Sequence, residues 1–353
     1  MGAIRRLAAA DRDRAGELWR AVELAAETPR FAAGWEWTCL WLEHFGELVP
    51  HEFLIAEDAD GEPCGATLLT HGVSSSRVLP VRSLHLGTAG VEKPDDVYVE
   101  CNRLLARPDA REEVARSLIE ELSGETGWDE LALDGFVAAD AELLAAAAPA
   151  LRLRAEPSPY AELTTLAERG DGDLVAGLGR NTRQQVRRSA RELGDPRVTA
   201  AEDADAALAV FEGLVELHQA RWLAAGEPGA FASERVVAFH RELIRRRAPD
   251  GALLFRVEAE GETVACLYSH VEDGTAFFYQ GGIAEALSPK VHPGLLAHAL
   301  CMSACLDHGI TEYDFLGGES RYKRQLSTAE RTLYWGTLRR GRLRPLLRRL
   351  RRA

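Results

Sequence analysis

One pattern of predicted strands and helices occurs twice in this sequence. Each copy begins with two short apolar runs joined by an acidic, glycine-containing turn, which is typical of a β-hairpin. Each copy continues with a further strand, an amphipathic helix and a strand that carries aspartate. Two copies of one unit predict an α/β fold with a mixed sheet in tandem duplicated domains. The hairpin strands are expected at 53–56 with 64–69 and at 254–257 with 264–268, the helices at about 108–124 and 293–308, and the final strands at 130–134 and 312–316.

The chain length agrees with this duplication. Its 353 residues suit two domains at roughly 150 residues each. With 46% hydrophobic and 27% charged residues, the composition is that of a globular protein and excludes a fibrous or disordered chain. We expect an N-terminal domain at 1–155, a C-terminal domain at 156–338 and a basic tail at 339–353.

Charge is distributed unevenly along the chain. The net charge is −13, and residues 1–150 alone carry 13 basic and 28 acidic side chains. The negative overall charge disfavours non-specific binding to nucleic acid. Residues 339–353 hold eight arginines and no acid, with leucines at helical spacing. A basic amphipathic helix there would suit an anionic membrane surface, RNA or the acidic first half; an intramolecular or disordered tail is the alternative.

Several classes of protein are disfavoured. No run approaches about 18 apolar residues, and the N-terminal segment has no apolar core typical of a secretory signal. The six cysteines lie apart, without a CxxC pair, which suits free thiols in a reducing cytoplasm. Cys301 and Cys305, flanked by His298 and His308, fall along one side of a predicted helix. We favour core packing for them and expect no metal site, because one helix cannot surround a metal with four ligands.

The loop before the second-copy helix is a candidate anion site. A strand at 276–280 is expected to be broken by Gly281-Gly282, and Pro293 suits the first turn of the following helix. The open N–H groups at that helix start, with Lys290, His292 and Gly294, would bind a phosphate or pyrophosphate. The alternative is a surface loop that proline caps.

Asp314 is the second candidate. It stands at the carboxyl end of an expected buried strand, between Tyr313 and Phe315, where open α/β sheets place their active sites. A buried carboxylate needs a partner or a raised pKa, so Lys323 or a nearby arginine should pair with it. The chemical role would be that of a general base or amine-orienting group; the alternative is a structural salt bridge.

Two further stripes have chemical potential. Strand-like alternation at 96–102 would send Asp96, Tyr98, Glu100 and Asn102 to one face, able to receive a cationic amine. Four arginines at helical spacing in 180–191 would bind phosphates of a cofactor or of RNA. A solvated face is the alternative for each. Trp222, on another predicted helix, is expected in the core or in a pocket wall.

These residues together resemble a known family. The segments 279–282, 293–296, 313–318 and 322–323, with the Glu-x-Asn at Glu100, are similar to the FemAB-like, CelD-type acyltransferases of the GNAT superfamily. The resemblance covers roughly residues 10–340. It implies tandem GNAT-like domains and an acyl-CoA donor bound between two splayed parallel strands, with its pyrophosphate on a loop that would be 284–294 here. Of the superfamily's usual loop pattern only Gly294 is retained, and Fem-type relatives use aminoacyl-tRNA instead.

The resemblance implies a transfer of an acyl group from acyl-CoA to an amine or hydroxyl of a small-molecule or polysaccharide-linked acceptor. An aminoacyl-tRNA-dependent, amide-forming transferase is the alternative, with tRNA as a partner, and a non-catalytic binding or assembly protein on the same fold is a third. In this scheme Asp314 would orient or deprotonate the amine, Lys323 would hold Asp314 or a donor phosphate, and Tyr322 would protonate the leaving group. The expected donor-binding residues are Tyr279, Gln280, Gly281, Lys290, His292 and Gly294, and the expected acceptor-binding residues are Tyr98, Glu100, Asn102 and Trp222.

Overall fold

The computed structural model describes residues 3–26, 32–75, 80–285 and 288–340. It divides the chain into two compact units, Met1–Glu156 with Thr332–Ala353 (unit 1) and Pro157–Arg331 (unit 2). Residues 332–338, expected in the second domain, therefore fold with the first, because their strand pairs with a strand of unit 1. The basic tail beyond Arg340 lies outside the described residues.

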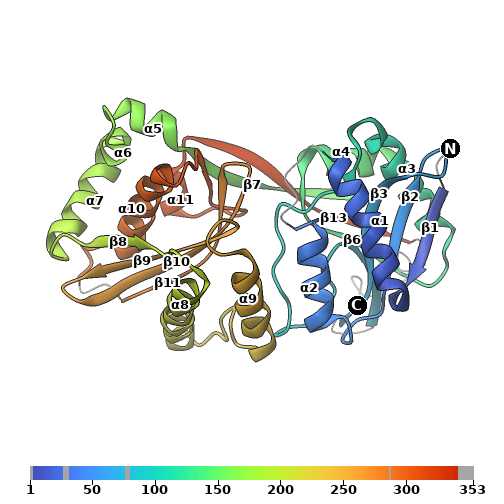
Figure 1. Cartoon of the computed structure of the whole chain (residues 1–353), viewed down its shortest axis with the longest axis horizontal. Coiled ribbons are helices and arrows are strands. Elements are labelled where there is room, and N and C mark those ends of the chain that lie inside the picture. The colour runs from blue at the N-terminus through green and yellow to red at the C-terminus, as the bar shows by residue number, and fades with distance from the viewer. Residues whose placement is uncertain (1–2, 27–31, 76–79, 286–287, 341–353) are drawn as a thin grey trace, which may run out of the picture. The chain divides into compact units, whose positions relative to one another are not determined.

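Unit 1 is a sheet with helices on it (Figure 1). Its strands run in the order β1-β2-β3-β4-β6-β13, and β4 and β6 are parallel while the other neighbouring pairs are antiparallel. The predicted first hairpin is confirmed as β2 and β3. The elements are β1 (Ala3–Ala8), α1 (Arg12–Ala25), α2 (Trp35–Phe45), β2 (His51–Glu57), β3 (Pro63–Ser75), β4 (Pro80–Leu86), β5 (Leu105–Ala106), α3 (Arg111–Gly124), β6 (Glu130–Val137), α4 (Ala138–Ala147) and β13 (Ala329–Arg339).

Unit 2 repeats this plan, as the duplicated sequence pattern predicted. Its strands run in the order β7-β12-β11-β10-β9-β8, and here β11 and β12 are the parallel pair. The second hairpin is confirmed as β9 and β10. The elements are β7 (Arg152–Glu162), α5 (Leu163–Arg169), α6 (Leu174–Gly177), α7 (Arg180–Glu192), β8 (Arg197–Ala200), α8 (Ala204–Ala224), α9 (Glu234–Arg247), β9 (Ala252–Ala259), β10 (Glu262–Glu272), β11 (Thr275–Ile283), α10 (Pro293–Asp307), β12 (Glu312–Asp314) and α11 (Arg321–Leu326).

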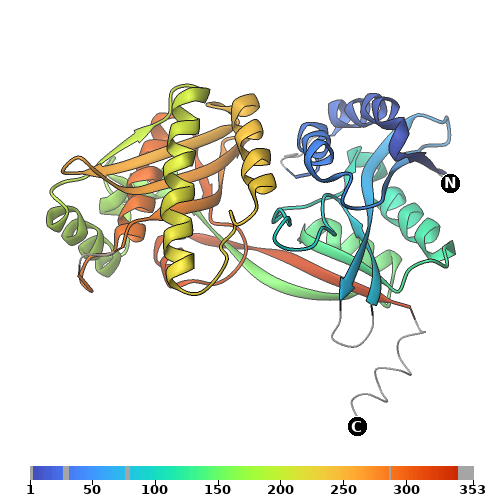
Figure 2. The same cartoon turned by 90° about the horizontal axis from the view of Figure 1, so that it is seen from below.

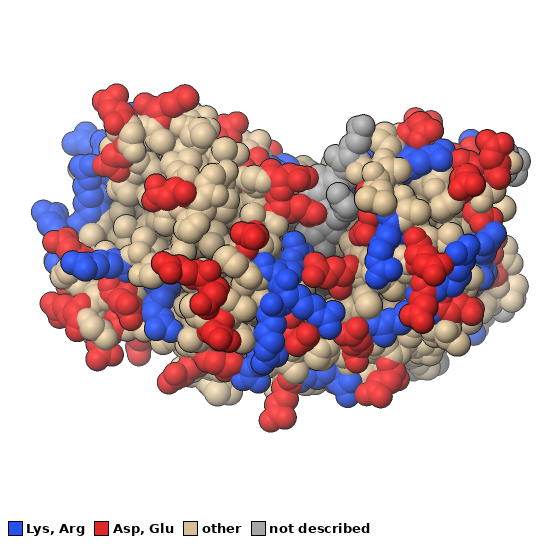
Figure 3. Space-filling view, in the orientation of Figure 1, with Lys and Arg blue, Asp and Glu red and all other residues tan. Residues whose placement is uncertain are grey.

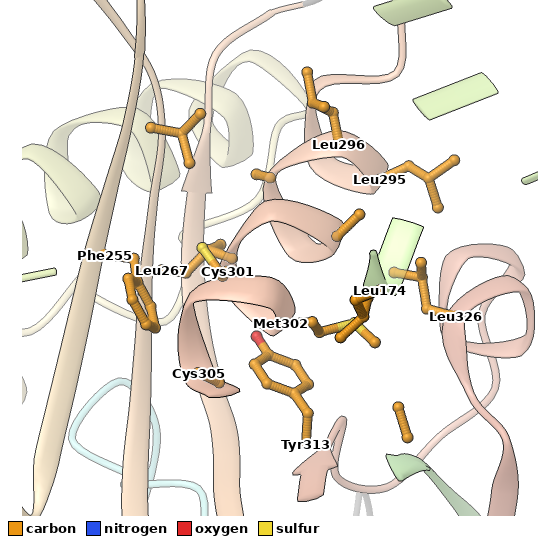
Figure 4. Packing of buried hydrophobic residues seen from close by; sticks show 14 of the residues in the cluster. Leu174, Phe255, Leu267, Leu295, Leu296, Cys301, Met302, Cys305, Tyr313 and Leu326 are labelled. Carbon is orange, nitrogen blue, oxygen red and sulfur yellow. The ribbon is translucent and has the colours of Figure 1, made fainter. Parts of the chain in front are cut away.

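Helices cover both faces of the unit 2 sheet. Along β10, Leu267 faces the core beneath α10, whereas the neighbouring Tyr268 meets Phe211 of α8; this alternation is the period of a strand buried on both sides. Figure 2 shows α8 lying across the strands of this sheet. On the α10 face, Cys301 and Cys305 are fully buried (Figure 4), so the predicted core packing of these thiols is confirmed.

The glycine pair in β11 does not break the strand. β11 continues through Gly281 and Gly282 to Ile283, contrary to the expected turn. A Cβ on Gly282 would lie 2.4 Å from the backbone oxygen of Leu214 in α8. Glycine is therefore present because a helix backbone packs directly against the strand, a close approach that any side chain would prevent.

Candidate functional site

The parallel strands of unit 2 separate soon after they meet. β11 and β12 pair only through Thr275–Phe277 and Glu312–Asp314, whereas β11 runs on to Ile283. The edge of β11 from 278 to 283 thus has no strand partner on its β12 side among the described residues. We call this separation the unit 2 gap. It lies at the carboxyl ends of two parallel strands, where α/β sheets commonly bind ligands.

A β-bulge re-aims β11 beside the gap. Tyr268 and Ser269 of β10 are opposite Gln280 and Phe278, which leaves Tyr279 as the extra residue. Bulges of this kind turn a strand and are frequent next to active sites. The predicted donor-binding residues Tyr279, Gln280 and Gly281 therefore lie on one strand at the gap, although in a continuous strand rather than before a turn.

The N-terminus of α10 presents open backbone donors. The His292 N–H donates to Ser189 Oγ at 3.0 Å, and Pro293 has no N–H. The N–H groups of Gly294 and Leu295 have no acceptor within the helix, by the geometry of any first turn. A Cβ on Gly294 would meet its nearest atom, on Ile283, at 3.8 Å. The Gly294 backbone is thus not crowded by protein atoms, and the open N–H groups of a helix N-terminus suit an anionic group.

Cations from α7 and the preceding loop lie near this helix start. Arg188 Nε donates to the backbone oxygen of Lys290 at 3.2 Å, and both residues retain exposed surface. Two members of the predicted arginine stripe are engaged elsewhere, Arg183 with Ala176 O and Arg187 with Asp173 at 3.5 Å. The predicted helix is confirmed, but the arginine that reaches the loop lies outside the predicted stripe.

Asp314 is completely buried at the end of β12. Its Oδ1 accepts hydrogen bonds from Leu316 N at 2.7 Å and Ser158 Oγ at 3.1 Å, and its Oδ2 lies 3.1 Å from Arg331 Nη1. Burial raises the pKa of Asp314 to about 6, against the lowering effects of Arg331, Leu316 N–H and Ser158. Because the Asp314 side chain has 0% exposure, its direct contacts are with these protein groups.

Lys323 does not pair with Asp314. Its Nζ donates to the backbone oxygens of Leu316 at 3.1 Å and Gly317 at 2.6 Å. These carbonyls belong to a turn in which Leu316 has φ +59° and Gly318 has φ +91°. The expected partner of the carboxylate is therefore Arg331, and Lys323 holds the turn that follows it.

Aromatic rings form the side of the gap beneath α10. The ring of Tyr322 stacks on His298 with centroids 4.8 Å apart, and Phe278 meets the same imidazole edge-on at 4.5 Å. Burial lowers the pKa of His298 to about 3, with a smaller contribution from Lys323, so the ring is neutral. His298 Nδ1 lies 3.2 Å from the hydroxyl of Tyr313. Sequence reasoning placed His298 in the core and did not relate it to Tyr322.

The segment expected to form an acceptor-binding strand in unit 1 is not a strand. Residues 96–100 have no regular secondary structure, and Cys101 has φ +57°. Tyr98 is 55% exposed and hydrogen-bonds to Glu100, which is buried. The alternation therefore ends at Glu100, because the left-handed φ of Cys101 is not a strand conformation.

Asn102 is buried between the parallel strands of unit 1. β4 and β6 pair through Ser83–His85 and Glu130–Ala132 and then separate. Asn102 bridges them: its amide nitrogen donates to Leu86 O at 3.0 Å, and its backbone bonds to Gly135 O and Val137 N at 2.9 Å each. Its hydrogen-bonding groups hold unit 1 together at the position that corresponds to the unit 2 gap.

Trp222 lies away from the residues described above. It is 41% exposed near the end of α8, where its ring is 5.9 Å from that of His218. The expected core position is therefore incorrect. In the part of the chain that the structure describes, no group of three His, Cys, Asp or Glu side chains has metal-binding geometry, and no helix is long and apolar enough to cross a membrane.

Comparison with known proteins identifies a family for most of unit 2. Residues 179–324 match the family described as "Acetyltransferase (GNAT) domain". This range begins just before α7 and includes the bulged strand, α10 and Lys323. No curated protein matches the sequence.

Solved structures share the fold of the whole chain at low sequence identity. FemX has a TM-score of 0.58 and 12% identity, covering 94% of this chain and 97% of its own. A C-terminal domain of a putative lysylphosphatidylglycerol synthetase from Agrobacterium fabrum has a TM-score of 0.57 and 12% identity, covering 95% and 94%. L-PGS from Bacillus licheniformis has a TM-score of 0.53 and 12% identity, covering 88% and 94%. At these identities the likeness extends to the fold alone.

Proposed function

We propose that unit 2, of which residues 179–324 match the acetyltransferase (GNAT) domain family, transfers an acyl group from acyl-CoA to an amine, or to a hydroxyl, of a small-molecule or polysaccharide-linked acceptor. The observation that carries the proposal is the unit 2 gap itself. An unpaired strand edge at 278–283 ends beside open N–H groups at Gly294 and Leu295. A CoA thioester has the matching parts, which are peptide-like amides in pantetheine and a pyrophosphate.

The donor would bind along these two features. The pantetheine amides would form hydrogen bonds with the backbone of Gln280 and Gly281, along the part of the β11 edge that β12 does not cover. The pyrophosphate would accept from the N–H groups of Gly294 and Leu295, with Lys290 and Arg188 supplying positive charge. The lack of a side chain at Gly294 supports this arrangement, because a phosphate oxygen must approach the backbone closely.

The chemistry requires few side chains. A neutral amine attacks the thioester carbonyl, the carbon–nitrogen bond forms, the carbon–sulfur bond breaks, and a proton passes from the amine to the departing thiolate. We assign Tyr322, which is half-buried on α11, to supply the proton to sulfur. Asp314 and Lys323 act as positioning residues, because they fix the turn at Leu316 and Gly317.

Binding of acetyl-CoA, measured by native mass spectrometry and calorimetry, tests the donor. We expect one acetyl-CoA per chain and at least tenfold weaker binding by Gly294→Val, whose side chain would enter the phosphate space. Gly124→Val is the control, because Gly124 belongs to unit 1 and has no atom within 4 Å of its Cβ position. Absence of binding, or equal binding by Gly294→Val and wild type, would refute a CoA donor.

The arginine surface of α7 supports a second candidate, an aminoacyl-tRNA donor. Arg180, Arg187 and Arg191 are exposed on this helix, and Figure 3 shows basic side chains gathered over it. Phosphate contacts of this kind would make binding of charged tRNA steeply dependent on salt. Retention of aminoacyl-tRNA that is lost in an Arg180→Gln, Arg187→Gln, Arg191→Gln variant, together with no acetyl-CoA binding, would select this donor.

A further inference from the structure

Unit 1 contains a cavity of about 470 Å³ that the proposed acyl transfer in unit 2 does not use. Its volume lies within the range of small-molecule sites. The cavity opens where β4 and β6 separate, beside the irregular segment that precedes Asn102. Its lining comprises Val73, Ser83, His85, seven residues of the 89–97 segment, Tyr98, Val99, Asp134 and Trp335.

The charge on this lining is mainly negative. The carboxylates come from Glu92, Asp96 and Asp134, and the basic side chain among the lining residues is Lys93. Asp134 Oδ2 lies 2.7 Å from His85 Nδ1, and the other ring nitrogen, Nε2, lies 3.0 Å from Ser83 Oγ. Both nitrogens of His85 are therefore engaged within the protein, and the imidazole is fixed in the wall.

Asp96 is the carboxylate that the fold does not satisfy. It is half-buried, and it has no hydrogen bond or ion pair within the described part of the chain. Burial raises the pKa of Asp96, and the charge of Asp134 raises it further, against smaller effects of Lys93 and His85. Because the charge of Asp134 disfavours the ionisation of Asp96, a cation between these two carboxylates would stabilise the ionised form of Asp96.

Aromatic side chains provide the apolar part of the lining. Tyr98 and Trp335 both face the cavity, and the guanidinium of Arg154 lies 5.3 Å from the Trp335 ring. The hydroxyl of Tyr98 is bound to Glu100, and burial raises the pKa of this phenol to about 12. The ring is thus held in place without a charge of its own and offers an apolar surface to a ligand.

From the cavity, its carboxylates and its aromatic lining we propose that unit 1 binds a small organic molecule bearing a protonated primary amine. The ammonium group lies between Asp96 and Asp134, and the carbon skeleton packs against Tyr98 and Trp335. A protonated amine fits because its N–H donors match carboxylate acceptors that the fold leaves available. The proposal concerns binding in unit 1 and is independent of the donor and of turnover in unit 2.

Matched pairs of ligands test the charge requirement. Calorimetry on the full chain at pH 7.5 would compare benzylamine with benzyl alcohol and tryptamine with tryptophol, with phenylacetate as an anionic probe. We expect each amine to bind at least tenfold more tightly than its alcohol. Equal affinities within each pair, or preferential binding of phenylacetate through Lys93, would overturn the proposal.

Variants locate the binding. Asp96→Asn should weaken benzylamine binding at least tenfold and leave folding intact, since Asp96 has no protein partner to lose. Asp95→Asn is the matched control, because it removes the same charge from a neighbour that does not line the cavity. Tyr98→Ala should also weaken binding, and Tyr98→Phe should preserve it. Benzylamine binding that is unchanged in Asp96→Asn would place the amine elsewhere and refute the site.

Discussion

The two units share one topology but differ at the point where their parallel strands separate. In unit 1, Asn102 bonds to Leu86 on one side and to Gly135 and Val137 on the other, and closes the separation. In unit 2, the corresponding edge of β11 is left without a strand partner in the described residues. The same architecture therefore provides a closed, structural position in one copy and a candidate donor site in the other.

The connection between strand and helix explains the difference. In unit 1 the chain between β4 and α3 spans residues 87–110 and folds back to place Asn102 between the strands. In unit 2 the chain between β11 and α10 spans only 284–292 and leads directly to the helix start. Loops carry functional change on a constant scaffold, and here one loop determines which copy retains an open edge.

Replacement of the buried carboxylate in unit 2 should have the largest effect on stability. Asp314→Ala leaves Arg331, Ser158 and the Leu316 N–H without their partner, and should cost about 3 kcal/mol, at the low end for a buried pair because Arg331 is partly exposed. The control is Asp134→Ala within β6, which should cost about 1 kcal/mol or less because its pair with His85 is partly exposed. Chemical denaturation of both variants measures the difference; equal losses would show that the two carboxylates are equivalent in stability.

The same carboxylate should make unit 2 sensitive to pH. Because the folded-state pKa of Asp314 is raised to about 6, its contribution to stability is fully present below its unfolded value and is lost as pH rises through about 6. Relative to Asp314→Asn, wild type should therefore lose about 3 kcal/mol between pH 4 and pH 7. Denaturation curves of the two proteins over this range measure it, and parallel pH profiles would contradict the assigned pKa.

The closing residue of unit 1 can be removed to test the comparison directly. Asn102→Ala leaves the buried oxygen of Leu86 without a donor and should destabilise unit 1 by about 2 kcal/mol. Acetyl-CoA binding should remain at one per chain, because the backbone bridge at Asn102 persists. A second acetyl-CoA bound by this variant would show that the side chain alone prevents donor binding in unit 1.

The smallest effect is expected at Lys323. Lys323→Met removes two hydrogen bonds from the turn at Leu316 and Gly317 and should cost about 1 kcal/mol. If Lys323 positions the turn, the variant should lower kcat for acyl transfer more than it raises KM. Loss of acetyl-CoA binding with kcat unchanged would instead assign Lys323 to the donor phosphates.

Local patterns in the sequence predicted much of the fold. Apolar runs joined by acidic, glycine-containing turns predicted the two hairpins, and the 3.6-residue period with Pro293 predicted α10. Both signals arise within a few residues. The prediction was wrong where a distant segment determined the conformation. Gly281 and Gly282 indicated a turn, but both pair with β10 in a continuous strand, and Gly282 lies directly against the backbone of α8.

The candidate site shows the same division. Sequence alone placed Asp314 and the start of α10 in one repeated unit, since their order follows the duplicated pattern, and the family resemblance added Tyr322 and Lys323. Only the tertiary structure decided that Arg331 rather than Lys323 pairs with Asp314, that His298 supports Tyr322, and that Asn102 closes unit 1. The physical reason is that periodicity reports which face of an element is buried, whereas the partner of a buried polar group depends on segments that are far away in the chain.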